Sequence, residues 1–132
     1  MNTERGSLTV ELVLLSPLLA ILVLFCVHAG RLGEAKNQVQ HAADQGARKG
    51  SQVSHSRIEN EARKATLEDL SKSGIACINS RVEVMLISIG SFDAVQVNVT
   101  CDVRSDGTEL LGLFPDTVHA SSVEVIDRWR VL

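Results

Sequence analysis

Residues 12–27 form an unbroken apolar run, LVLLSPLLAILVLFCV, that contains no charged residue. With Glu11 included, the segment extends from Leu8 to Val27, and a helix of about 20 residues spans about 30 Å. This matches the thickness of the hydrocarbon core of a bilayer, so the run predicts a membrane-spanning helix. A carboxylate inside such a segment costs about 2.5 kcal/mol or more when it is placed centrally, and a cost of that kind usually marks a function.

The rest of the chain excludes several classes of partner. From Arg31 onward it mixes polar and apolar residues over about 100 positions, which allows one modest core. A net charge of −3 offers no basic surface to nucleic acid. Three Phe, one Trp and no Tyr give little material for base stacking or for a large cofactor pocket. We therefore expect no nucleic-acid partner and no cofactor.

Three ordinary interpretations of the apolar segment stay open. It can be an uncleaved signal anchor, or a secretory signal peptide that is cut before Gly30, where small residues precede the bond. The basic charge ahead of the segment is weak, because Arg5 is offset by Glu4. A lipoprotein signal at Cys26 is disfavoured, because Phe25 stands where a small residue is needed.

A fourth interpretation accounts for Glu11. The spacing Gly6-x-x-x-x-Glu11 at the start of an apolar helix resembles the prepilin-peptidase site of type IV pilins. The resemblance implies cleavage between Gly6 and Ser7, which makes Glu11 the fifth residue after the cut. A glycine lets the substrate backbone approach the peptidase closely. The carboxylate can then neutralise the free α-amine inside the apolar packing of a filament.

Residues 4–50 are similar to the N-terminal half of TadE-like proteins, the minor pilins or pseudopilins of the tight-adherence (Tad) pilus. The matching features are the E-R-G-S end of the leader, Val10-Glu11, Pro17 in the apolar run, Gly30-Arg31 just after it, and the later Ala-Ala and Gly-Ala-Arg steps. The sequence departs from the expected pattern at Cys26 and His28, where apolar or aromatic residues would be usual.

The resemblance implies a structural role in pilus assembly. It divides the chain into a prepilin-type leader (1–6), a transmembrane or filament-core helix (7–29) and an extracytoplasmic domain (30–132). The implied partners are a prepilin peptidase, other Tad pilins or pseudopilins with their assembly machinery, and the lipid of the bacterial inner membrane. The alternative is an uncleaved single-pass membrane protein with an extracytoplasmic binding or scaffold domain.

Helical periodicity continues beyond the apolar run. Over residues 31–49 a narrow stripe of mostly small residues recurs every three or four positions, at Leu32, Ala35, Val39, Ala42 and Gly46. The stripe permits close packing, either on the protein's own sheet or on neighbouring subunits. A second helix is predicted over 57–72, with Ile58, Ala62, Ala65 and Asp69 or Leu70 on its buried face. Its predicted ends are a capping box of Ser56 and Glu59 and a C-terminal Gly74.

From Ser80 onward the period changes to two. Val95, Val97, Val99, Cys101 and Val103 share one face of a predicted strand over 94–104, and polar residues occupy the other. We predict a partner strand over 81–89, a turn over 90–93, and a third strand between Val118 and Arg130. A loop over 105–116 carries Leu110, Leu111, Leu113 and Phe114, which we expect at an edge of the core. The fold class is therefore α+β, with a long N-terminal α-helix, a second helix and a small antiparallel sheet of about three strands.

Cys77 and Cys101 both lie outside the apolar run. In an exported domain they predict a disulfide, which in a core of this size would contribute about 3 kcal/mol on the chain-entropy model. Two buried free thiols are the alternative. The four histidines are scattered, and none has a Cys or carboxylate at metal-ligand spacing, so we expect no metal site. No catalytic set is visible, and we do not expect an enzyme.

Overall fold

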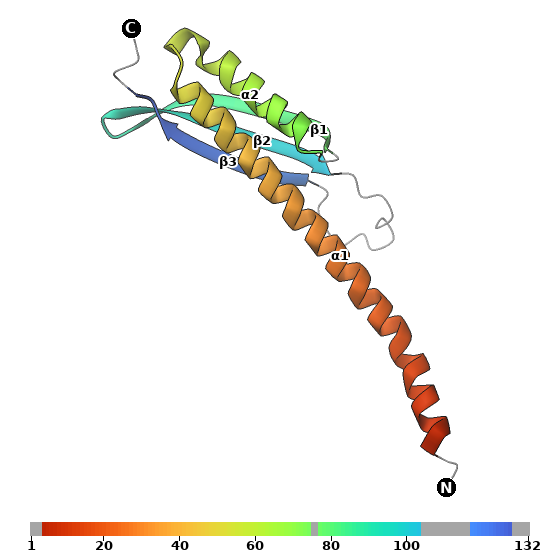
Figure 1. Cartoon of the computed structure of the whole chain (residues 1–132). Helices are drawn as coiled ribbons and strands as arrows, with labels where there is room; N and C mark the ends of the chain where they lie inside the picture. The colour runs from red at the N-terminus through yellow and green to blue at the C-terminus, as the bar shows by residue number, and fades with distance from the viewer. Residues whose placement is uncertain (1–3, 75–76, 104–116, 128–132) are drawn as a thin grey trace. The chain divides into compact units, whose positions relative to one another are not determined.

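The computed structural model describes residues 4–74, 77–103 and 117–127, with side chains from Thr9 onward. Its elements are α1 (Glu4–Ser51), a 3₁₀ turn η1 (His55–Arg57), α2 (Ile58–Lys72), β1 (Cys77–Ile89), β2 (Phe92–Val103) and β3 (Thr117–Val125) (Figure 1). This confirms the predicted α+β fold. The chain forms two compact units, residues 1–31 and 32–132, and α1 contributes to both. The predicted loop over 105–116 lies outside the described residues.

The sheet has the order β1-β2-β3, and both pairings are antiparallel. The strands extend further than the sequence predicted, because β1 begins at Cys77 and β2 already begins at Phe92. The predicted four-residue turn is wrong, since Ile89 pairs with Phe92 and only Gly90-Ser91 connects the strands. Gly90 has φ 62°, as the first central residue of a type II′ turn requires. That turn matches the twist of the strands, so their pairing continues to its edge.

Helix α1 packs its stripe of small residues on one face of this sheet. Ala35, Val39 and Ala42 are at most 4 % exposed and lie in one core cluster with Val97 and Val99 of β2. The first of the two predicted interpretations, packing on the protein's own sheet, is therefore confirmed for this stripe. Figure 1 shows α1 and α2 lying side by side over the same face of the sheet. The domain thus has two layers, helices on sheet, with the core between them.

Helix α2 occupies almost the predicted range, but its buried face includes a residue that the sequence missed. The buried side chains are Ile58, Ala62, Thr66 and Leu70, whereas Ala65 is only partly buried. Thr66 is buried because its hydroxyl donates to the carbonyl oxygen of Ala62 at 2.8 Å, inside the helix. The polar group is thereby satisfied and the methyl group can pack in the core.

The predicted capping box at the start of α2 is wrong. Ser56 lies inside η1, and the N-cap of α2 is Arg57, without a side-chain hydrogen bond. The backbone N–H of Ile58 bonds instead to the carbonyl oxygen of His55, so the turn itself satisfies a donor that the serine would have served. The other end agrees with the prediction, because Gly74 follows the C-cap Ser73 with φ 68°.

Strand β2 has the predicted alternation. Val95, Val97, Val99 and Cys101 are at most 1 % exposed on the helix side of the sheet. The opposite face carries polar cross-strand contacts, from Ser121 Oγ to Asn98 Oδ1 at 2.7 Å and from Thr117 Oγ1 to Asp102 Oδ1 at 2.9 Å. Both edge strands are also hydrogen-bonded to the helices. Arg63 of α2 donates to the carbonyl oxygen of Val82 in β1 at 2.9 Å, and Gln40 of α1 donates to the carbonyl oxygen of Ser121 in β3 at 3.0 Å.

Candidate functional site

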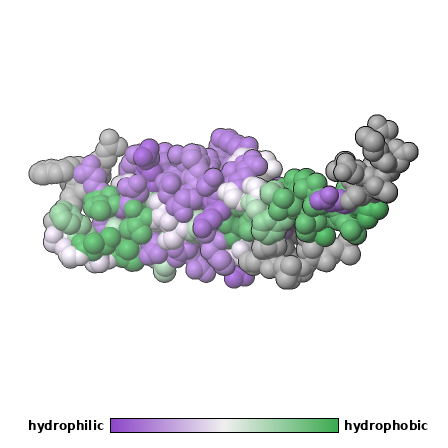
Figure 2. Space-filling view, turned by 90° about the horizontal axis from the view of Figure 1, so that it is seen from below, coloured by the Kyte–Doolittle hydropathy of each residue, from purple (hydrophilic) through white to green (hydrophobic). Residues whose placement is uncertain are grey.

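The first part of α1 carries apolar side chains on every side of the helix. Between 43 % and 71 % of each of these side chains is exposed: Val10, Leu12, Val13, Leu14, Leu15, Leu18, Leu19, Ile21, Leu22, Val23, Leu24, Phe25 and Val27. Figure 2 shows them as a green surface at its right-hand end. A helix that is apolar all round needs an apolar environment, either lipid or other helices. Among the described residues, α1 is the one helix that is long and apolar enough to cross a membrane.

Glu11 lies in this part of α1, with an exposed side chain. Its neighbours one turn further along the helix, Leu14 and Leu15, are apolar and exposed as well. Among the residues that the structure describes, the carboxylate takes part in no ion pair. A lone carboxylate is costly in a hydrocarbon environment.

Gly6 and Ser7, the predicted cleavage residues, lie in the first turn of α1, where only the backbone is described. They precede Glu11 on the same helix, so all three residues of the predicted site belong to α1. The helix continues through Pro17, which removes one backbone donor.

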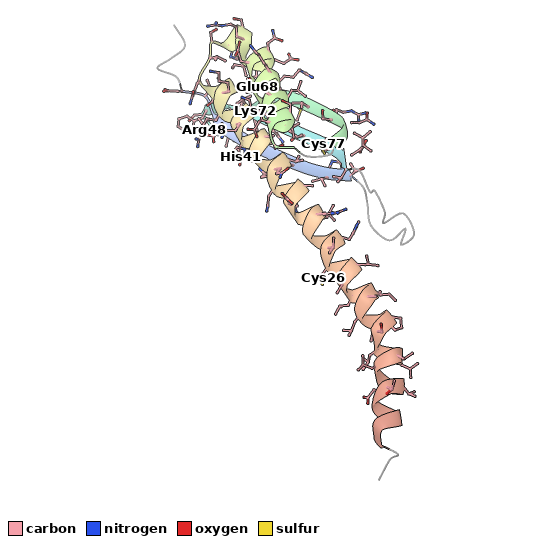
Figure 3. All side chains as sticks on the ribbon, turned by 45° about the vertical axis from the view of Figure 1, so that its right-hand side comes forward. Cys26, His41, Arg48, Glu68, Lys72 and Cys77 are labelled. Atoms are coloured by element: carbon pink, nitrogen blue, oxygen red, sulfur yellow. A yellow bond between two sulfur atoms is a disulfide. The ribbon has the colours of Figure 1, made fainter. Side chains whose placement is uncertain are left out.

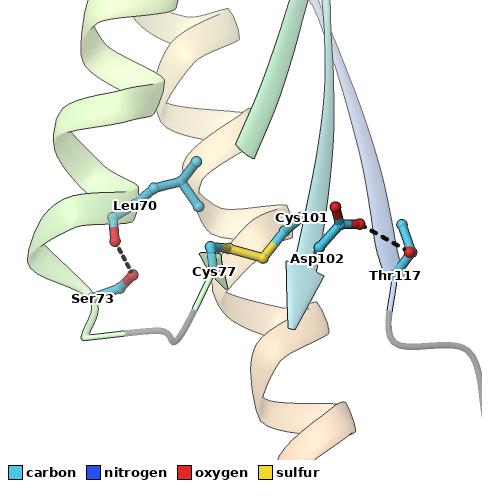
Figure 4. Close-up of a disulfide and its surroundings, with 6 residues drawn as sticks. All are labelled: Leu70, Ser73, Cys77, Cys101, Asp102 and Thr117. Carbon is cyan, nitrogen blue, oxygen red and sulfur yellow. Dashed lines mark hydrogen bonds between the residues drawn. A yellow bond between two sulfur atoms is a disulfide. The ribbon is translucent and has the colours of Figure 1, made fainter. Parts of the chain in front are cut away.

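Cys77 and Cys101 form a disulfide, with their Cα atoms 5.5 Å apart. Figure 4 shows the bridge between the start of β1 and the end of β2, close to Leu70 of α2. Cys101 is fully buried, so the bridge closes the end of the core that lies opposite the Gly90-Ser91 turn. Cys26 is a free, exposed thiol on α1 (Figure 3).

The histidines form no metal site among the described residues. His41 has a side chain that is 62 % exposed, and its Nδ1 lies 2.8 Å from Asp69 Oδ2, which links α1 to α2 (Figure 3). His119 Nδ1 lies 3.2 Å from Thr100 Oγ1 on the outer face of the sheet.

A surface ion pair that was not predicted from the sequence lies near the end of α2. Lys72 Nζ donates to Glu68 Oε1 at 2.7 Å, and this hydrogen bond lowers the pKa of the Glu68 carboxyl and raises the pKa of Lys72. Both side chains are exposed, so the pair is a surface feature. The spacing of four residues along a helix was the signal that could have revealed it.

Comparison with known proteins gives a match over the N-terminal part of the chain. The model of the family described as TadE-like protein matches residues 6–48. This confirms the resemblance predicted from the sequence. The matched stretch begins at the predicted cleavage residue, includes the exposed apolar part of α1 and Glu11, and reaches the last turn of the helix. No curated protein and no solved structure matches the chain.

Proposed function

We propose that this chain, whose N-terminal part matches the TadE-like family, is a minor pilin or pseudopilin that takes part in assembly of a Tad-type pilus. The observation that carries the proposal is the family match over residues 6–48, which coincides with an apolar helix that contains one carboxylate. A pilin has two such parts: the apolar half of the helix anchors the subunit in the membrane or in the filament core, and the remaining domain lies outside it.

The proposed processing follows from the same segment. A prepilin peptidase cuts between Gly6 and Ser7, residues 1–6 are lost, and residues 7–29 remain as the membrane or filament-core helix. Residues 30–132 then form the extracytoplasmic domain. The Cys77–Cys101 disulfide supports that location, because disulfides form and persist in oxidising compartments. The proposed partners are the peptidase, neighbouring pilins with the assembly machinery, and membrane lipid.

Two other functions are compatible with an apolar N-terminal helix. One is an uncleaved single-pass membrane protein with an extracytoplasmic binding or scaffold domain. The other is a secreted protein that is cut before Gly30. N-terminal sequencing of protein isolated from cells distinguishes the three, because the mature chain begins at Ser7 in the pilin, at Met1 in the anchored protein and at Gly30 in the secreted one.

A substitution at the scissile bond tests the processing step directly. Co-expression with a prepilin peptidase is expected to shorten the wild type and to leave Gly6→Leu at full length, because the side chain obstructs the approach to the backbone. Gly30→Leu is the matched control, since a Cβ at Gly30 meets no atom within 4 Å. It should be shortened like the wild type. Equal shortening of all three proteins would remove the pilin proposal.

A further inference from the structure

The face of the sheet that points away from the helices carries an exposed apolar area at the hairpin end. We call it the hairpin patch, and it consists of Met85, Ile89, Phe92, Val123 and Val125, each between 42 % and 52 % exposed. The register joins these positions into one surface, since Ile89 pairs with Phe92, Val125 with Ala94, and both Met85 and Val123 with Gln96. Figure 2 shows it as a green area at the left-hand end.

The charges around the hairpin patch have one sign. Residues 83–98 and 121–127 include Glu83, Asp93, Glu124 and Asp127, and no Lys, Arg or His. The register places Glu83 on the patch face, whereas Asp93 and Glu124 share the opposite face with Val95. A second copy or an anionic lipid surface would still meet only negative charge at this end of the sheet. A segment that fits must therefore combine apolar side chains with positive charges.

Such a segment follows the last strand directly. The backbone N–H of Ile126 donates to the carbonyl oxygen of Asp93 at 2.8 Å, so the chain just beyond β3 is held at the hairpin end of the sheet. Residues 128–132, which lie outside the described residues, have the sequence Arg-Trp-Arg-Val-Leu. Three of them are apolar and two are cationic, which complements the patch in both respects.

The reach of this segment is sufficient. Neighbouring strands lie about 4.8 Å apart, so a path across the three strands is about 10 Å long. Five extended residues span about 17 Å. A chain that turns after Asp127 can therefore cross from β3 over β2 to β1 without displacing any strand.

We propose that residues 128–132 bind across the hairpin patch of their own chain, with Trp129 against the apolar side chains and Arg128 and Arg130 beside the carboxylates. The segment then covers an exposed apolar area on the face of the described sheet that points away from the helices. This inference is independent of processing at Gly6, because it concerns the opposite end of the chain.

The chain contains a single tryptophan, so its fluorescence reports on Trp129 alone. In the purified full-length protein, Trp129 is expected to be shielded from acrylamide. The double variant Ile89→Thr/Val125→Thr keeps β-branched side chains but makes the patch polar, and it should raise the quenching constant several-fold. Leu67→Gln changes an apolar side chain that is 42 % exposed on α2 and should leave quenching unchanged.

A second variant covers the case in which the patch variant fails to fold. Arg128→Glu/Arg130→Glu leaves every described residue intact and should also raise quenching, because Glu83 on the patch face would repel the new carboxylates. Wild-type quenching that equals that of the free peptide Arg-Trp-Arg-Val-Leu, or that is unchanged in both double variants, would overturn the proposal. Shielding that weakens on dilution would overturn it as well, since it would assign the segment to a second copy.

Discussion

At the scale of single residues, Gly46 allows a close approach between α1 and α2. A Cβ at this position would overlap Thr66 Oγ1 and lie 3.0 Å from the carbonyl oxygen of Ala62. The carbonyl is backbone and cannot move alone, and Thr66 is fully buried. Gly46→Ala is therefore expected to lower the free energy of unfolding by about 1–3 kcal/mol through overpacking. Thermal unfolding of the detergent-solubilised full chain measures this.

Gly33 provides the matched control on the same helix. A Cβ at Gly33 meets no atom within 4 Å, so Gly33→Ala adds no contact and only improves helix propensity. It should raise the free energy of unfolding by about 0.5–1 kcal/mol. If Gly46→Ala and Gly33→Ala shifted the unfolding midpoint in the same direction and by the same amount, the close approach at Gly46 would not affect stability.

At the scale of elements, the Cys77–Cys101 disulfide joins the two longest strands at the end that their turn leaves open. The two cysteines are 24 residues apart in sequence, and a bridge across such a loop stabilises by about 3 kcal/mol on the chain-entropy model. Cys77→Ala/Cys101→Ala is expected to lower the urea midpoint accordingly. Cys26→Ala, which removes an exposed free thiol, should not change it. A wild-type midpoint that is unaffected by reductant would contradict this account.

Periodicity predicted the elements well, and their ends poorly. The alternation of Val95, Val97 and Val99 is a local pattern that burial on one face imposes, so the sequence alone reveals it. The place where a strand ends depends on its partner: Phe92 belongs to β2 because it pairs with Ile89. The start of α2 depends in the same way on the η1 turn, which made a cap at Ser56 unnecessary.

The candidate site could be named from the sequence alone, because it consists of residues close together in sequence. Gly6, Ser7 and Glu11 lie within two turns of one helix, and their spacing is visible without a fold. Thr66 and Gly46 meet only because two helices lie side by side, so no local pattern marked Thr66 as a core residue. Long-range contacts of this kind need the structure.

At the scale of the whole molecule, the proposed function gives Glu11 a role in pilus assembly. If cleavage exposes the α-amine of Ser7, the carboxylate of a neighbouring chain can pair with it in a low-dielectric environment, where a lone amine would be costly. Glu11→Ala is therefore expected to be cut normally, because the residue lies away from the scissile bond. The processed variant should accumulate in the membrane, and pili should lose the protein or decrease in number.

The control is a carboxylate of α1 outside the apolar part. Glu34 is exposed and accepts a hydrogen bond from Gln38 at 3.1 Å within its own helix, so Glu34→Ala should be both processed and assembled. Immunoblots of membranes and of sheared pili, with N-terminal sequencing of each band, separate the two steps. An uncut Glu11→Ala chain would assign the residue to recognition by the peptidase. Cut Glu11→Ala protein in sheared pili at the wild-type level would show that assembly does not need the carboxylate, and its place in the apolar helix would then require another explanation.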